Sequence, residues 1–344
     1  METITINGTN DECFSSAAKA LREGRLVAFP TETVYGLGAN ALDPQAVRRI
    51  FESKGRPLDN PLIVHIANIS QLEPLVKEIP DRAEALIRAF WPGPLTLVMK
   101  KSELVPDEIT AGLDTVAVRM PDNPVALRLI EEAGVPVAAP SANLSGRPSP
   151  TTYQHVLEDL NGRIEYIING GPCKIGVEST VLDITSETPV ILRPGGVTME
   201  MLETVIGKVE TDAVLKPEDG KKPRSPGMKY RHYSPNAEMF LVEGESEEVV
   251  RKINLLTSEN SAKGLRTGVL SSLENKDRYT AQVVVNIGSL SCLEEVASKL
   301  YNALRKFDEE KVDIIYSESF TEKGMGRAIM NRLRKAASGK ISVP

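Results

Sequence analysis

A stretch containing four prolines divides this chain into two regions. Residues 212–236 include Pro217, Pro223, Pro226 and Pro235. Proline fixes φ and has no backbone N–H, so it interrupts helices and is excluded from central strands. The chain has 344 residues, which is more than a single hydrophobic core usually contains. The sequence therefore predicts two domains, residues 1–211 and residues 237–344, joined by a linker over residues 212–236.

The first region alternates short apolar runs with helix-like segments. The expected strands are Leu26–Phe29, Leu62–Ile66, Leu95–Met99, Val116–Val118, Val135–Ala139, Tyr166–Ile168, Ser179–Leu182 and Val190–Leu192. The expected helices include Asp11–Glu23, Pro44–Phe51, Asp81–Phe90 and Pro124–Ala133. This alternation predicts an α/β domain in which helices flank a mixed, largely buried sheet.

The second region has a smaller α/β pattern. Its expected strands are Met239–Val242, Thr267–Leu270, Gln282–Ile287 and Val312–Tyr316, and its expected helices are Glu245–Leu256, Leu293–Phe307 and Ala328–Ala337. In the second of these helices the apolar residues fall on one face, and Ser291 with Glu294 has the pattern of a capping box. We expect a small Rossmann-like domain.

Charge, cysteine content and hydropathy exclude several classes of protein. The net charge of -6 and the pI of about 5.4 argue against nucleic-acid binding over the whole surface. The three cysteines lie far apart, which favours a reducing cytoplasm over a disulfide framework or a zinc site. The sequence has no export signal and no apolar run near the ~18 residues of a membrane span. We expect a cytoplasmic protein without a membrane segment.

The segment KGRPLDNPLIVH predicts a cationic turn that leads directly into a buried strand. Lys54 and Arg56 lie in this turn, and His65 lies inside the apolar run that follows. Open α/β sheets bind ligands at strand ends, and an arginine fork beside a lysine suits phosphate or carboxylate. A solvated surface turn explains these residues equally well when the segment is taken alone.

Two further segments place small and hydroxyl-bearing residues after apolar runs. In PTETVYGLGANA the pattern GxGxxA is not a dinucleotide site, because six residues separate its glycines from the strand. Thr31, Glu32 and Thr33 are instead expected at a sheet edge, where hydroxyls and a carboxylate can bind a polar ligand, or in a plain loop followed by a glycine turn. In APSANLSGRPSP the small and polar residues predict an anion-binding turn, although such a composition alone favours a flexible surface loop. These residues are Ser141, Asn143, Ser145, Gly146, Arg147 and Ser149.

Arginines end two of the predicted strands, and aromatic residues with positive charge occupy the linker. Arg119 ends the alternating run TVAVR, in which Thr115, Ala117 and Arg119 are expected on one face of the strand. Arg193 ends the strand before two glycines. An arginine in an apolar setting needs an anionic partner, which is either a substrate or a structural carboxylate. In SPGMKYRHYSP, Tyr230 and Tyr233 with their basic neighbours could cover a nucleotide, or the segment could simply dock on the first domain.

Several catalytic motifs are missing from the sequence. It contains no GxxxxGK[ST], HExxH, CxxC or GxSxG, and its three histidines have no close spacing. We therefore expect no metal held by protein ligands alone and no side chain acting as a dedicated nucleophile. The chemistry must come from positioning and charge neutralisation.

Eight segments, taken in order, resemble one family. They are PTETVYGLG, KGRPLDNPLIVHI, WPGPLTLV, TVAVRMPDNP, APSANLSGRPSPT, GVESTVLDI, LRPGG and SPGMKYRHYSP. Together they look like the L-threonylcarbamoyladenylate synthases in their long form, with a YrdC-type catalytic domain and a C-terminal domain. The resemblance covers most of residues 20–236 and departs at Ser234, where alanine is expected. It implies a YrdC-like twisted mixed sheet, with the linker acting as an active-site lid.

The resemblance also implies a reaction and its partners. Threonine and bicarbonate give N-carboxythreonine, which attacks the α-phosphate of ATP to form threonylcarbamoyl-AMP and pyrophosphate. Mg²⁺ accompanies ATP. Other proteins then transfer the threonylcarbamoyl group to tRNA next to the anticodon, and a weak tRNA contact is expected. The alternatives are an RNA-binding module and a carbamoyltransferase that forms a carbamoyl adenylate, although the zinc-finger cysteines of the latter are missing here.

The same resemblance assigns residues to two subsites. Those implied for ATP are Lys54, Arg56, Asn60, Thr115, Ser141, Asn143, Ser149, Arg193, Tyr230 and Tyr233. Those implied for threonine are Thr33, His65, Arg119, Ala139 and Ser179, with Arg119 facing the carboxylate.

Overall fold

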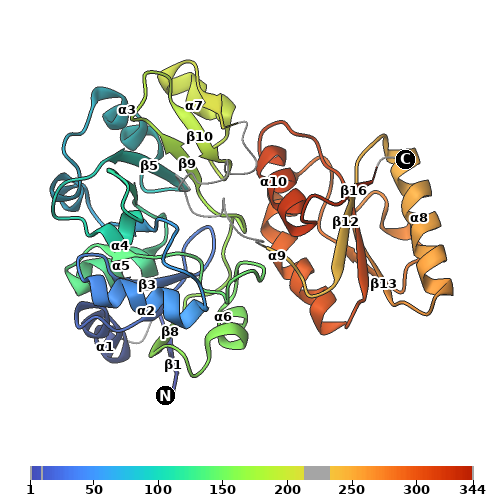
Figure 1. The fold of residues 1–344 in the computed structure, drawn as a ribbon, viewed down its shortest axis with the longest axis horizontal. Helices are drawn as coiled ribbons and strands as arrows, with labels where there is room; N and C mark the ends of the chain where they lie inside the picture. The colour runs from blue at the N-terminus through green and yellow to red at the C-terminus, as the bar shows by residue number, and fades with distance from the viewer. Residues whose placement is uncertain (1, 9–10, 213–232, 343–344) are drawn as a thin grey trace. The chain divides into compact units, whose positions relative to one another are not determined.

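The computed structural model describes residues 2–8, 11–212 and 233–342 (Figure 1). It divides into two compact units, which we describe separately. The first unit consists of Met1–Ser145, Ser149–Lys174 and Glu178–Tyr230, and the second of Gly146–Pro148, Ile175–Val177 and Arg231–Pro344. The sequence assigned the two short segments of the second unit to the first domain. Most of the predicted linker lies outside the described residues.

The first unit contains a mixed sheet of eleven strands among the described residues. The strands are β1 (Ile4–Asn7), β2 (Val27–Phe29), β3 (Gly36–Asn40), β4 (Ile63–His65), β5 (Leu95–Lys100), β6 (Thr115–Arg119), β7 (Val137–Ala138), β8 (Tyr166–Asn169), β9 (Thr180–Asp183), β10 (Val190–Arg193) and β11 (Glu210–Thr211). Their order is β1-β8-β2-β3-β7-β4-β6-β5-β9-β10-β11. Parallel and antiparallel pairs both occur, which confirms the predicted mixed sheet.

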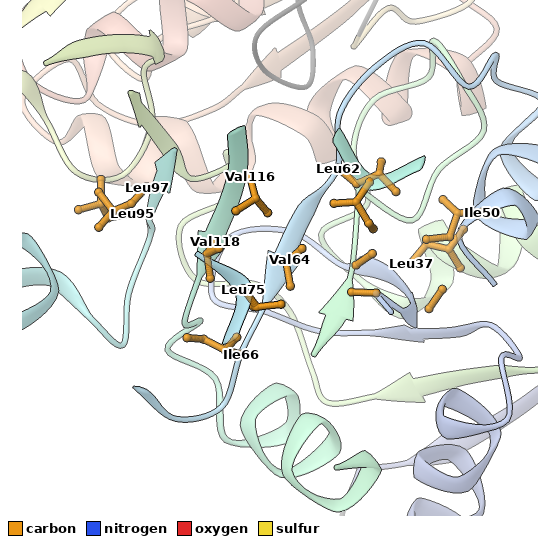
Figure 2. Packing of buried hydrophobic residues seen from close by; sticks show 14 of the residues in the cluster. Leu37, Ile50, Leu62, Val64, Ile66, Leu75, Leu95, Leu97, Val116 and Val118 are labelled. Carbon is orange, nitrogen blue, oxygen red and sulfur yellow. The ribbon is translucent and has the colours of Figure 1, made fainter. Parts of the chain in front are cut away.

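Helices flank this sheet as the sequence predicts. They are α1 (Asp11–Arg22), α2 (Pro44–Lys54), α3 (Asp81–Phe90), α4 (Asp107–Thr110), α5 (Pro124–Ala133), α6 (Tyr153–Leu160) and α7 (Met199–Ile206), with 3-10 turns at Ile69–Gln71 and Glu73–Leu75. Side chains alternate between the two faces of a strand, so neighbouring residues enter different cores. In β2, Val27 and Phe29 pack with α1 and α5, whereas Ala28 joins the larger core. Figure 2 shows Val64 of β4 and Val118 of β6 side by side in that core.

Helix α2 ends at a position that the sequence assigned to a turn. Asp43 caps its first turn, because the carboxylate accepts a hydrogen bond from the Gln45 N–H at 2.9 Å. Gly55 ends the helix with φ 61, a left-handed conformation that costs glycine little. Lys54 is therefore the last helical residue, and its side chain is buried rather than solvated. The reading of Lys54 as a turn residue was wrong.

The second unit has a five-stranded parallel sheet with helices on both faces. Its elements are β12 (Glu238–Val242), α8 (Ser246–Ala262), β13 (Thr267–Ser271), a 3-10 turn (Lys276–Arg278), β14 (Val283–Asn286), α9 (Leu293–Glu309), β15 (Ile314–Glu318), α10 (Gly326–Ala336) and β16 (Ile341–Ser342). The strand order is β14-β13-β15-β12-β16. Helix α8 covers one face, and α9 and α10 cover the other (Figure 1). This arrangement confirms the predicted Rossmann-like domain.

Two local predictions differ from the structure. The residue before helix α9 is Cys292, and no side chain caps the helix there, so the predicted capping box of Ser291 and Glu294 does not form. The Ser291 hydroxyl instead lies 2.8 Å from that of Ser289. Residues Gly36–Asn40 form strand β3, where a turn was expected; pairing with β2 and β7 outweighs the low strand propensity of glycine.

Candidate active site

One face of the first unit's sheet carries most of the predicted threonine-binding residues. A small apolar cluster lies there, made of Ile63, Val98, Ala117, Val181 and Leu192. His65 and Arg119 come two residues after Ile63 and Ala117, so they share this face. They are also direct neighbours in the parallel register of β4 and β6. Strand alternation thus places a histidine beside an arginine at one end of the apolar cluster.

Arg119 forms a buried ion pair with Glu32. Its Nη2 lies 2.7 Å from Glu32 Oε2, and its Nε donates to the Gly93 carbonyl at 3.2 Å. Both side chains are nearly inaccessible to solvent. The sequence left open whether the anion beside Arg119 is a substrate or a structural carboxylate. The structure places a carboxylate of the chain itself beside Arg119, and an arginine has five N–H donors, so a second anion can also bind.

His65 is uncharged in this setting. Burial and the nearby Arg119 lower the pKa of its imidazole to about 3, and Arg193 contributes in the same direction. Its Nδ1 lies 3.3 Å from the Ile63 carbonyl. The ring of Phe29 lies edge-on to it, with centroids 6.3 Å apart. A neutral imidazole beside Arg119 can form hydrogen bonds to a ligand without adding charge.

Ser179 links the second arginine to this face. Arg193 Nε donates to the Ser179 carbonyl at 3.1 Å, and Nη2 donates to Ser179 Oγ at 3.0 Å. Thr96 Oγ1 lies 2.8 Å from the same hydroxyl. Gly195 comes two residues after Arg193 in the sequence. A Cβ at this position would lie 2.3 Å from the Glu178 carbonyl oxygen, so only glycine fits. Ser179, predicted for threonine, and Arg193, predicted for ATP, are therefore in direct contact.

Lys54 organises the loop of small residues. Its Nζ donates to the carbonyls of Ser141 at 2.5 Å and Asn143 at 2.6 Å, and the Lys54 carbonyl accepts from the Ser145 N–H at 3.1 Å. Burial and the neighbouring Arg56 lower the pKa of Lys54 to about 7, while the two carbonyl acceptors favour the ammonium form. The loop is thus tied to the end of α2, and the alternative of a flexible surface loop is wrong for residues 141–145.

A second buried contact joins two of the predicted loops. Ser149 Oγ donates to Glu178 Oε1 at 2.5 Å, and both side chains are buried. Next to Glu32 in the sequence, the Thr33 hydroxyl lies 2.8 Å from that of Thr31. The sequence placed the Glu32 carboxylate at a sheet edge where it could bind a polar ligand, but neither Glu32 nor Glu178 was assigned to a subsite, although a carboxylate inside an apolar segment was a usable signal.

The remaining predicted residues take varied positions. Asn60 is fully buried and its amide donates to Asp59 at 3.1 Å, while Thr115 begins β6 on the same face as Arg119. The Ala139 N–H donates to the Ile63 carbonyl at 3.0 Å. Arg56 lies with its guanidinium 5.9 Å from the centre of the Phe51 ring.

Of the two linker tyrosines, Tyr233 lies within the described residues and Tyr230 does not. Tyr233 is buried in the second unit, where its ring stacks on Tyr301 at 5.4 Å and lies 5.5 Å from the Arg332 guanidinium. Arg147 also belongs to this unit, and its guanidinium lies 4.0 Å from Asp308. Tyr230 lies outside the described residues, and its predicted role stays a prediction.

Two features are absent from the described residues. No three His, Cys, Asp or Glu side chains within 2–8, 11–212 and 233–342 are grouped so that they could hold a metal ion. Within the same ranges, no helix combines the length and apolar character needed to cross a membrane.

Comparison with known proteins defines the class. A family model named Sua5_yciO_yrdC and described as "Telomere recombination" matches residues 19–195. A second model, described as "Threonylcarbamoyl-AMP synthase, C-terminal domain", matches residues 197–338. The chain belongs to the Sua5/YciO/YrdC family and carries the C-terminal domain of its long members.

Two relatives and one solved structure are similar to this chain over nearly its whole length. The chain is 54% identical to the threonylcarbamoyl-AMP synthase of Bacillus subtilis, over 97% of this chain and 95% of the relative. It is 55% identical to that of Pyrococcus abyssi, over 94% of each chain. A crystal structure of P. abyssi Sua5 complexed with L-threonine matches with a TM-score of 0.94 at 53% identity, covering 99% of this chain and all of that one.

Proposed function

We propose that this chain is a nucleotidyltransferase that makes L-threonylcarbamoyl-AMP from L-threonine, bicarbonate and ATP, with release of pyrophosphate. The observation that carries the proposal is the pair of buried arginines at the ends of β6 and β10: Arg119 is the register neighbour of His65, and Arg193 donates a hydrogen bond to the Ser179 hydroxyl. The carboxylate of an amino acid and the phosphates of a nucleotide each form charge-assisted hydrogen bonds with a cationic group. The near full-length similarity to threonylcarbamoyl-AMP synthases supports the same conclusion.

Threonine would bind at the end of the apolar cluster. Arg119 would take its carboxylate, and the neutral His65 with the hydroxyls of Thr33 and Ser179 would bind its polar groups. The backbone at Ala139 would complete the subsite. The complex of P. abyssi Sua5 with L-threonine supports this choice of substrate.

ATP would bind along the loop that Lys54 organises. It brings about four negative charges, and each charge-assisted hydrogen bond contributes about 1.5–3 kcal/mol. Arg56 and Arg193 would supply such bonds. The other contacts proposed for the nucleotide come from Asn60, Thr115, Ser141, Asn143 and Ser149. Because Tyr233 is buried against Tyr301, we assign the proposed lid over the nucleotide to Tyr230.

The reaction would proceed by positioning. A carboxylate oxygen of N-carboxythreonine attacks the α-phosphorus, and the bond between that phosphorus and the bridging oxygen breaks as pyrophosphate leaves. No side chain serves as nucleophile. Mg²⁺ would arrive with ATP, held mainly by phosphate and water. We propose that the product serves cytoplasmic tRNA modification next to the anticodon, through partner proteins that accept the threonylcarbamoyl group.

The first test is pyrophosphate release by the purified chain, with threonine and bicarbonate each supplied or omitted. Release that requires both supports the synthase. Release that depends on carbamoyl phosphate instead of threonine would favour the carbamoyltransferase, and salt-sensitive RNA binding without any release would favour the RNA-binding module.

The division of the site into two subsites has its own test. Arg56→Ala should mainly raise the KM for ATP, and Arg119→Ala should mainly raise the KM for threonine. Equal losses for both substrates in both variants would contradict this division.

A further inference from the structure

Glu32 carries unused hydrogen-bonding capacity in a buried position. Its side chain is 5% exposed, and neither of its carboxylate oxygens accepts a hydrogen bond from the described residues. Its contact with Arg119 at 2.7 Å is an ion pair only. A carboxylate can accept about four hydrogen bonds, and buried acceptors in proteins are rarely left without a donor.

Three described groups near Glu32 leave this capacity open. The Thr31 hydroxyl donates to the Val34 carbonyl at 2.7 Å. The thiol of Cys173 is a weak donor, and burial raises its pKa to about 12, so it stays neutral. Arg119 is the cation beside Glu32, and its Nη2 makes no hydrogen bond with the described part of the chain either. Within residues 2–8, 11–212 and 233–342, the acceptor capacity of Glu32 therefore stays open to a ligand.

The pair offers two opposite charges at the spacing of one small molecule. Arg119 has open donors and Glu32 has open acceptors, and the facing atoms lie 2.7 Å apart. An α-amino acid carries its ammonium and its carboxylate on the same carbon. A ligand of this kind can place its carboxylate against the guanidinium and its ammonium against the carboxylate at the same time.

We propose that Glu32 binds the α-ammonium of the amino-acid substrate, so that Glu32 and Arg119 together recognise an L-α-amino acid as a zwitterion. The proposal rests on the proposed function, which places threonine at Arg119. It adds a specificity-determining residue: the site should reject a 2-hydroxy acid of the same shape, because a site built to bind one polar group discriminates against the analogue that lacks it.

Calorimetric titration of the full chain tests this. The two probes are L-threonine and (2S,3R)-2,3-dihydroxybutanoate, which replaces the ammonium with a hydroxyl and keeps the carboxylate and the β-hydroxyl. The variants are Glu32→Gln and, as a matched control, Glu318→Gln, which changes a buried glutamate in the second unit. Thermal unfolding of each variant checks that it is folded, and Glu32→Asp replaces Glu32→Gln if the latter is not.

We expect Glu32→Gln to weaken threonine binding by about 10–100-fold, the range of one hydrogen bond between charged groups. The same variant should bind dihydroxybutanoate at least as tightly as the wild type, because it removes a negative charge beside Arg119. The control should bind both probes as the wild type does. If Glu32→Asp is the variant used, an intermediate loss for threonine alone supports the proposal.

Two other outcomes would overturn it in distinguishable ways. Equal losses for both probes in Glu32→Gln would mean that Glu32 only holds Arg119 in place, and unchanged threonine binding would mean that it has no role. In both cases the wild type still binds threonine, so the proposed function stands. A wild type that binds neither probe would overturn the proposed function and this inference with it.

Discussion

Two buried glutamates, one in each unit, differ in how their carboxylates are satisfied. Glu318 at the end of β15 accepts hydrogen bonds from the Tyr279 hydroxyl at 2.9 Å, the Ser272 N–H at 3.2 Å and the Asn275 amide at 3.2 Å. Glu32 has a charged neighbour, Arg119, and no hydrogen bond from the described residues. Their exposed fractions, 3% and 5%, are almost the same. Burial alone therefore does not separate a structural carboxylate from one that awaits a ligand, whereas hydrogen-bond satisfaction does.

The difference follows from the elements around each residue. In the second unit, β13 and β15 are parallel neighbours, so Glu318 and the segment after Ser271 meet at the same sheet edge. That segment supplies donors from a backbone N–H, an amide and a hydroxyl. Burial and Glu318 raise the pKa of Tyr279, which keeps its hydroxyl protonated and able to donate. In the first unit Glu32 lies in a loop, facing a strand from a distant part of the chain.

The largest effect is expected at the ion pair. Arg119→Ala leaves Glu32 buried without its counter-charge, so it should lower the stability of the first unit by about 3–5 kcal/mol. Denaturant unfolding followed by fluorescence measures this, because Trp91 is the single tryptophan and belongs to the first unit.

The double variant Glu32→Ala/Arg119→Ala serves as the control. It removes both charges and should recover part of the loss. If it is no more stable than Arg119→Ala, the two charges do not depend on each other in the way that the structure indicates.

In the second unit, Glu318→Gln should cost about 1–3 kcal/mol, because the new amide group faces donors with a donor of its own. Hydrogen exchange in β13 and β15 should quicken, while the Trp91 unfolding midpoint and the KM for threonine stay unchanged. A shift in the KM would mean that Glu318 is not purely structural, and the contrast with Glu32 would be lost.

The stability of the first unit should depend on pH through His65. The native pKa of His65 is about 3 against 6.5 for the ordinary side chain, so between these values the unfolded chain binds a proton that the native chain does not. Stability is retained above pH 6.5 and falls as the pH decreases through this window, by up to about 1.4 kcal/mol per pH unit. His65→Gln should remove this part of the slope, as measured by Trp91 unfolding at pH 7 and pH 5. Equal slopes in wild type and variant would contradict it.

The smallest effect concerns a hydroxyl that has no partner among the described residues. Ser272 Oγ is buried in the second unit and forms no hydrogen bond with them. Ser272→Ala should therefore be neutral or raise stability by up to about 1 kcal/mol, because only an unsatisfied group is lost. Hydrogen exchange across β13 gives the readout, and a clear loss of protection would show that the hydroxyl has a partner, such as a buried water.

Local features of the fold were readable from the sequence. Helices α3 and α5 have the predicted bounds, because their apolar spacing and flanking prolines lie within a few neighbouring residues. The strand alternation in TVAVR also placed Thr115, Ala117 and Arg119 on one face, as the separate clusters of Ala117 and Val118 confirm. Strand β3 was missed because its glycines have the composition of a turn, and only its neighbours in the sheet make it a strand.

The order of motifs and the arginines at strand ends came from the sequence alone. Which groups these residues contact was decided by the tertiary structure: Arg119 with Glu32, Lys54 with the carbonyls of Ser141 and Asn143, and Ser149 with Glu178. Periodicity and turn chemistry depend on residues a few positions apart, so they can be read locally. The partner of a buried polar group depends on the strand order, which brings remote segments together and excludes the water that would otherwise satisfy them.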